Sequence, residues 1–315
     1  MQWLAGVDEA GLGPILGPLV IAGIAFTGEA GSDPWSILQS HVSRLRHEKG
    51  KVRVADSKKV HSGVHGLRRL EETSLTFWAV LHGELPATVE QWLKQLGCDL
   101  DPLRRCPWYQ QLDIRLPLFA DAGFVLLQAE LIRRTMARHG MALSKIVVRP
   151  VDVEEWNGLI AQTNNKSRAH FHAYGEVISR LLDALPGNGH LVADRCSGRM
   201  HYGTELRRLR PGARIEILRE EPAISSYRLH QAEREALLTF AEKGEDRAFP
   251  TALASCFAKY TRELMIHVLN EWFAHKVTGI LPTAGYFVDG HRFLNDLAPH
   301  WDALALPREL LVRVR

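Results

Sequence analysis

Residues 3–24 constrain the fold more than any other stretch, because an apolar run there ends in two adjacent acids and a turn rich in glycine and proline. The short apolar run 3–7 is typical of a buried strand, and residues 18–26 resume a strand pattern after the turn. We therefore expect Asp8 and Glu9 at a strand end, pointing to opposite faces of a sheet. One interpretation is an exposed strand end with a tight turn. The other is half of a metal site.

The composition is that of an ordinary soluble globular enzyme. The chain has 315 residues, of which 46% are hydrophobic and 24% charged, and this length suits one domain or two small ones. No run of eighteen apolar residues or secretory signal is present, so we expect a cytoplasmic protein without a membrane span. The four cysteines lack C-x-x-C spacing, which disfavours a zinc knuckle or a disulfide framework. The net charge of +3 is too small to indicate a polyanionic partner by itself.

The remaining patterns predict alternating strands and helices. Further strands are expected at 74–82, 145–151, 189–194 and 213–219, and helices at 63–73, 116–138, 153–185, 225–240 and 254–276. Residues 84–140 are interrupted by prolines and contain no cluster of catalytic residue types. The tail from Pro299 shows no clear chemistry.

A third acid, Asp194, ends the short apolar strand 189–194 and so repeats the geometry of the opening stretch. Arg195, Ser197 and Arg199 follow it directly. They suit a contact with phosphate, and a turn with exposed arginines is an equally weighted alternative.

A fourth acid is predicted on the long helix near the C-terminal end. Ser255, Lys259 and Glu263 are spaced four residues apart and therefore share one helix face. A solvated ion pair is the competing interpretation of that spacing. The basic block 41–59 contains Asp56-Ser57-Lys58-Lys59, which suits either a phosphate clamp or a solvated loop.

Four converging carboxylates would repel one another unless cations neutralised them, which predicts hard divalent metals with oxygen ligands. In nucleic-acid hydrolysis, two such ions about 4 Å apart activate the attacking water and stabilise the leaving oxygen. A protein nucleophile is then not required.

Five segments, in this order, resemble motifs of the type 2 ribonuclease H family, which comprises ribonuclease HII and its relatives. They are Asp8-Glu9-Ala10-Gly11-Leu12-Gly13-Pro14, Asp56-Ser57-Lys58-Lys59, Ala193-Asp194, the helix 254–263 with its Ala-Lys-x-x-Arg core, and Gly285-Tyr286. The first and fourth of these motifs are specific, whereas the second and fifth are weak alone.

The resemblance implies an α/β, ribonuclease H-like fold in which a central mixed sheet of about five strands is flanked by helices. It implies one catalytic domain over residues 1–315, with 84–140 as an inserted region and 277–315 as a C-terminal extension that carries the Gly-Tyr turn. We expect a monomer.

The resemblance also implies an endonuclease that cuts the RNA strand of RNA–DNA hybrids, or a duplex containing ribonucleotides, and leaves 5′-phosphomonoesters. The implied ligands of two Mg²⁺ or Mn²⁺ ions are Asp8, Glu9, Asp194 and Glu263. The implied substrate contacts are Gly11, Leu12, Gly13, Lys58, Arg195, Ser197, Arg199, Ser255, Lys259 and Tyr286. Glycine-loop amides would read the 2′-hydroxyl, and Tyr286 would stack on the sugar or base next to the cut.

Two residues depart from the family pattern. Leu12 stands where the family has arginine, which removes guanidinium donors from the loop that reads the junction between ribonucleotide and deoxyribonucleotide. The related type 3 enzymes also lack that arginine, so we expect cleavage within RNA tracts and weak action on a single embedded ribonucleotide. Glu263 replaces the usual aspartate and keeps its charge. The alternative functions are a non-catalytic hybrid-binding module and a DNA-directed nuclease of the same broad fold.

Overall fold

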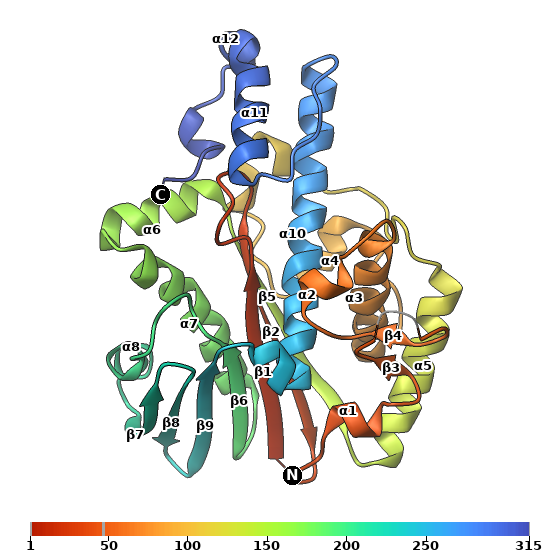
Figure 1. Ribbon diagram of the computed structural model, residues 1–315, viewed down its shortest axis with the longest axis vertical. Coiled ribbons are helices and arrows are strands. Elements are labelled where there is room, and N and C mark those ends of the chain that lie inside the picture. Colours follow the sequence, from red (N-terminus) through yellow and green to blue (C-terminus); the bar gives the residue numbers. More distant parts are fainter. Residues whose placement is uncertain (1, 46–47, 315) are drawn as a thin grey trace.

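The computed structural model describes residues 2–45 and 48–314, so Arg46 of the predicted basic block lies outside the described part. Helices cover both faces of a mixed sheet (Figure 1). The strands are β1 (Gln2–Ala10), β2 (Leu19–Gly28), β3 (Val42–Ser43), β4 (Val52–Arg53), β5 (Ala142–Val151), β6 (Gly189–Asp194), β7 (Arg214–Glu221), β8 (Ile224–Gln231) and β9 (Arg234–Ala241). The helices are α1 (Pro34–Ile37), α2 (Ser57–Val60), α3 (Gly66–His82), α4 (Val89–Gln95), α5 (Ala122–Arg138), α6 (Val153–Thr163), α7 (Lys166–Ala184), α8 (Gly203–Leu209), α9 (Gly244–Arg247), α10 (Phe249–Lys276), α11 (Phe287–Leu297) and α12 (Trp301–Leu304).

The main sheet has seven strands within the described residues, in the order β5-β2-β1-β6-β9-β8-β7. Strands β1, β2 and β5 are antiparallel neighbours, and β6 and β9 run parallel to β1. The hairpin-linked β8 and β7 extend the sheet beyond β9. The predicted α/β class and helix-flanked mixed sheet are confirmed. The expected five strands correspond to β5, β2, β1, β6 and β9, and β8 and β7 account for the difference.

Strand β1 separates two apolar cores because its side chains alternate between faces. Ala5 and Val7 pack with α6, α7 and α8 on one face. On the other face α10 crosses β1 so closely that a Cβ on Gly6 would lie 2.1 Å from the backbone nitrogen of Thr251. The start of α10 is therefore fixed next to the middle of β1 (Figure 1).

Two secondary-structure predictions are wrong. Residues 74–82 form the second half of helix α3 rather than a strand, and residues 225–240 form the hairpin β8–β9 rather than a charged helix. In β8, Tyr227 and Leu229 are buried at the two-residue spacing of a strand. The intervening charges misled the interpretation, because Arg228 pairs across strands with Glu216.

Residues 84–140 pack into the same core as α3 and α10. Trp92 of α4 stacks between Trp78 and Phe257, with ring centroids 4.9 and 5.4 Å away. Buried Glu71 of α3 accepts backbone N–H bonds from residues 118–120 at 2.6–2.7 Å and a hydroxyl bond from Tyr260 of α10. That this region is an insertion stays a prediction.

The C-terminal segment returns to the glycine-rich turn after β1, where Val312 forms a β-bridge with Leu16. Within the described part of the chain, every helix is too short or too polar to cross a bilayer.

Candidate active site

Two of the predicted acids lie at neighbouring strand ends. Val7 pairs with Ala193 in the parallel ladder of β1 and β6, so the next residues along both strands are Asp8 and Asp194. The Tyr174 hydroxyl, on α7, lies 2.8 Å from the Val7 carbonyl oxygen and 3.1 Å from the Asp194 carbonyl oxygen. This buried hydroxyl holds the two strand ends together below the acids.

The three acids of the two strands resist ionisation. Burial raises the pKa of Asp8, which is only 8% exposed, and the charges of Glu9 and Asp194 raise it further. Burial and then Asp194 raise the pKa of Glu9 to about 8, against the opposing charge of Lys58. Burial also raises the pKa of Asp194, although the Gly244 N–H donates to its Oδ1 at 3.0 Å.

Glu245 is an acid that the sequence interpretation missed. It lies in the short helix α9, directly after the Gly244 that binds Asp194, and its charge raises the pKa of both Asp8 and Glu9. Burial and then the charge of Asp194 raise the pKa of Glu245 itself. The signal was present in the sequence, since the apolar end of β9 runs into an acidic turn as β1 and β6 do. The incorrect helix over 225–240 concealed that strand end.

The predicted fourth acid, Glu263, has different neighbours. Its carboxylate forms an ion pair with Lys259, and its Oε1 lies 3.7 Å from Nη1 of Arg262. Among the charges that raise the pKa of Asp8 and Glu9 are those of Asp194 and Glu245. The shared face of Lys259 and Glu263 was predicted correctly, whereas the acid whose charge acts on Asp8, Glu9 and Asp194 together is Glu245.

Glu9 points toward α7, on the face opposite to Asp8. Its Oε1 lies 3.6 Å from Nε2 of His170, and its Oε2 is buried without a hydrogen-bond partner in the described residues. Burial, helped by the charges of Arg199 and Lys166, lowers the pKa of His170 to about 4. The neutral imidazole therefore supplies no charge that would compensate an ionised Glu9.

These donors fit a hard divalent cation in chemistry, because all are carboxylate oxygens and one of them is buried without a partner. No three His, Cys, Asp or Glu side chains of residues 2–45 and 48–314 already form a metal-ligand cluster. In the structure, Asp8 Oδ1 accepts the Glu9 N–H at 2.7 Å.

The glycine turn and the Gly-Tyr turn form one unit. Gly285 accepts backbone hydrogen bonds from Ile15 (2.9 Å) and Leu16 (3.2 Å), and a Cβ on Gly285 would lie 2.5 Å from the Leu16 oxygen. Gly11 has φ +91°, and a Cβ there would lie 2.5 Å from the Arg262 side chain. Both positions therefore require glycine.

Tyr286 stands at the edge of this unit and is 48% exposed. The Arg262 guanidinium carbon and the Lys259 ammonium lie 5.4 and 5.8 Å from its ring centroid. These cations hold the ring while leaving one side accessible. Lys259 therefore contacts Glu263 and Tyr286.

Ser255 and Lys58 belong to the contact between α2 and α10. The Ser255 hydroxyl, only 2% exposed, accepts the Ser57 N–H at 3.1 Å and donates to the Ala252 oxygen at 2.8 Å. It is thus a structural residue that positions the Asp-Ser-Lys motif rather than a surface contact. Lys58 is exposed, and its charge lowers the pKa of Glu9 and Asp194.

The residues after Asp194 are largely engaged within the protein. Arg195 pairs with Glu242 at 2.5 Å, and Arg199 pairs with Glu205 at 3.3 Å and donates to Ser167. Ser197 is exposed with φ +54°. Of the three predicted phosphate contacts, only Ser197 presents a side chain without an internal ion pair or hydrogen bond in the described structure.

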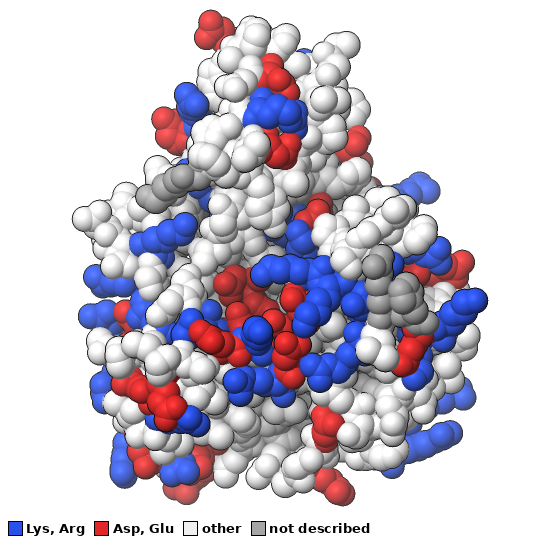
Figure 2. Space-filling view, viewed as in Figure 1, with Lys and Arg blue, Asp and Glu red and all other residues white. Residues whose placement is uncertain are grey.

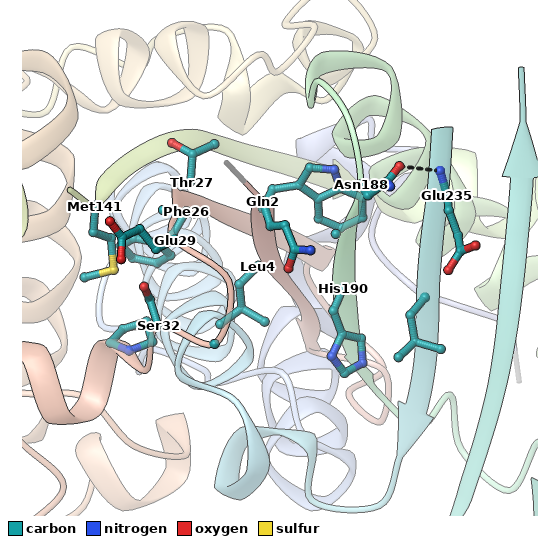
Figure 3. A pocket seen from close by; sticks show the side chains of 16 residues that line it. Gln2, Leu4, Phe26, Thr27, Glu29, Ser32, Met141, Asn188, His190 and Glu235 are labelled. Atoms are coloured by element: carbon teal, nitrogen blue, oxygen red, sulfur yellow. Dashed lines mark hydrogen bonds between the residues drawn. The ribbon is translucent and has the colours of Figure 1, made fainter. Parts of the chain in front are cut away.

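Figure 2 shows acidic side chains gathered near the middle of one face and bordered by lysines and arginines. A separate cavity has a volume of about 430 Å³. Figure 3 shows the side chains that line it, among them Gln2, Leu4 and His190. It lies at the opposite end of β1 from Asp8 and Glu9. This hollow is thus not where the acids meet, and no chemistry follows from it.

No family model matches the chain, and no curated protein does. Among solved structures, the chain is similar to one in the PCNA–RNase HII complex from Archaeoglobus fulgidus, with 18% identity and a TM-score of 0.42, covering 99% of this chain and 94% of the other. The chain is also similar to ribonuclease H2 from Pyrococcus horikoshii OT3, with 15% identity and a TM-score of 0.37, over 98% of this chain and 92% of the other. A third similar structure is Bst-RNase HIII in complex with Mn²⁺, with 14% identity and a TM-score of 0.40, over 99% of this chain and 66% of the other.

Proposed function

We propose that this protein is a metal-dependent endonuclease that cleaves the RNA strand of RNA–DNA hybrids and leaves 5′-phosphomonoesters. The convergence of Asp8, Glu9 and Asp194, all with raised pKa values, carries the proposal. Such a group is destabilising without a cation and is relieved by one. The five motifs, in their order along the chain, support the choice of nucleic acid as substrate.

The proposed metal ligands are Asp8, Glu9, Asp194 and Glu245, with Glu245 in the role first predicted for Glu263. Bound Mg²⁺ or Mn²⁺ would supply an activated water and stabilisation of the leaving oxygen. The exposed ammonium of Lys58 lowers the pKa of Glu9 and Asp194 and is suited to hold the substrate phosphate beside them.

The glycine turn is suited to distinguish RNA from DNA. Around Gly11 the backbone can approach a ribose closely, and the amides of Leu12 and Gly13 can donate to a 2′-hydroxyl. Tyr286 is suited to stack on the sugar or base beside the cut, because Arg262 and Lys259 fix its ring. Lys259 and Glu263 act here as positioning residues.

The proposal is tested with three labelled duplexes: a long RNA–DNA hybrid, a DNA duplex with one ribonucleotide, and plain DNA. We expect RNA-strand cleavage of the hybrid with Mg²⁺ or Mn²⁺, and none in EDTA or with Asp8→Asn. Asp113→Asn, at an exposed position, is the matched control. Hybrid binding without cleavage under either ion would indicate a binding module and contradict the proposal. Cleavage of plain DNA at a similar rate would indicate a DNA nuclease instead.

A further inference from the structure

A cavity of about 290 Å³ lies against the glycine turn. Leu12 and Gly13 form one side, and Lys166 and Arg313 contribute to the other. These two basic residues are the only charged residues among the described ones that line it. The cavity therefore carries positive charge without an acid in its wall.

Arg313 is built into the turn from the C-terminal segment. Its N–H donates to the Ile15 oxygen at 2.9 Å, and its Nη1 donates to the Gly11 oxygen at 2.5 Å. The residue is 5% exposed, and its guanidinium carbon lies 5.7 Å from the centroid of the Trp156 ring. The tail that showed no chemistry in the sequence thus places a cation directly under the loop that follows Asp8 and Glu9.

The charge of Arg313 is not compensated. Its Nε and Nη2 have no hydrogen-bond partner in the described structure, and no carboxylate there lies within ion-pair distance. Burial, and then the nearby Arg262, lower its pKa to about 9, against smaller opposing effects of Tyr109 and Asp152. A buried cation without a counter-charge is costly, and an anion in the adjoining cavity would offset that cost.

Lys166 supplies the accessible part of the site. It is exposed and begins helix α7, whose 19 residues direct a positive dipole end toward the same place. Arg313 Nε and Nη2 are shielded from solvent, so this guanidinium acts on an anion chiefly through its charge. Lys166 can contact the anion directly.

The cavity adjoins the turn that follows the acids. Its wall includes Leu12, three residues after Glu9. Lys166 begins the helix that carries His170, whose Nε2 lies 3.6 Å from Glu9 Oε1. An anion held by Lys166 would therefore lie beside the turn that follows Asp8 and Glu9.

We propose that this cavity binds a backbone phosphate of the nucleic acid next to the one that is cleaved, with Lys166 and Arg313 supplying positive charge beside Leu12. The inference rests on the proposed function for its ligand. The proposed phosphate site requires only that the protein binds the nucleic acid, whereas the proposed function also requires cleavage. The site can therefore be tested without cleavage.

The test measures binding of a labelled RNA–DNA hybrid in EDTA by fluorescence anisotropy over a range of salt concentrations. Lys166→Gln should weaken binding by about 3- to 10-fold and reduce the salt slope by about 0.9, as expected for one lost phosphate contact. Lys145→Gln, which changes an exposed lysine on the edge strand β5, should leave both unchanged. Arg313→Lys should retain the slope and Arg313→Met should reduce it, with thermal unfolding used to check that each variant folds.

A scan of single neutral methylphosphonate linkages identifies the phosphate. One linkage should weaken wild-type binding and have no further effect on Lys166→Gln. Equal salt slopes for Lys166→Gln and Lys145→Gln, or a scan without such a linkage, would overturn the proposal. Stabilisation of the protein by inorganic phosphate combined with a flat scan would assign the cavity to free phosphate and overturn it as well. Binding with this pattern but no cleavage with metal would refute only the proposed nuclease.

Discussion

Replacing Glu9 by glutamine should stabilise the metal-free protein, by an amount that grows with pH. The folded-state pKa of Glu9 is about 8 against an ordinary value of 4.5, so the folded protein binds this proton more tightly than the unfolded chain does. Between these values, wild-type stability should therefore fall as pH rises, by about 1.4 kcal/mol per pH unit. Glutamine removes the ionisable group and with it this loss.

The expected gain in unfolding free energy at pH 7 is about 3.5 kcal/mol, from about 2.5 pH units at about 1.4 kcal/mol each. At pH 5 it should be below about 1 kcal/mol. Urea unfolding in EDTA at both pH values measures the difference, and Glu233→Gln in the exposed β8–β9 turn is the control. A gain equal at the two pH values, or a loss at pH 7, would refute the idea that Glu9 is held against its ionisation.

Two substitutions test other parts of the site. Leu12→Arg should raise cleavage of a duplex with one ribonucleotide relative to the long hybrid, because it restores guanidinium donors to the turn; an unchanged ratio in a competition assay would contradict this. Tyr174→Phe should lower the unfolding free energy by about 1–2 kcal/mol, because the hydroxyl joins the carbonyls of Val7 and Asp194. Unchanged stability in urea unfolding would show that this bond does not hold the strands together.

The sequence predicts those strands and helices whose apolar residues recur at a single regular spacing. The strand ends carrying Asp8 and Asp194 and the long helix α10 follow from apolar runs of the right length. The hairpin β8–β9 could not be recognised in this way, because its exposed face is filled with charges that pair across strands. That error also concealed Glu245.

The parts of the site that depend on distant segments were not predictable. Helix spacing correctly put Lys259 and Glu263 on one face, but it cannot tell which segments that face meets. Close contacts of Gly6 with Thr251 and of Gly11 with Arg262 decide how α10 lies along β1 and the glycine turn. The position of Arg313 under the glycine turn likewise depends on a tail that returns to the turn through tertiary contacts alone.

We propose that Glu245, rather than Glu263, completes a metal-binding group with Asp8, Glu9 and Asp194. The most direct test compares Mn²⁺-dependent cleavage of the labelled hybrid by Glu245→Gln and Glu263→Gln. Glu245→Gln should lower the rate at least about 100-fold, or about 2.7 kcal/mol, because it removes a proposed ligand. Glu263→Gln should retain most of the rate and alter mainly KM, since Glu263 only positions Lys259. The reverse order, with Glu263→Gln inactive and Glu245→Gln near wild type, would contradict this account.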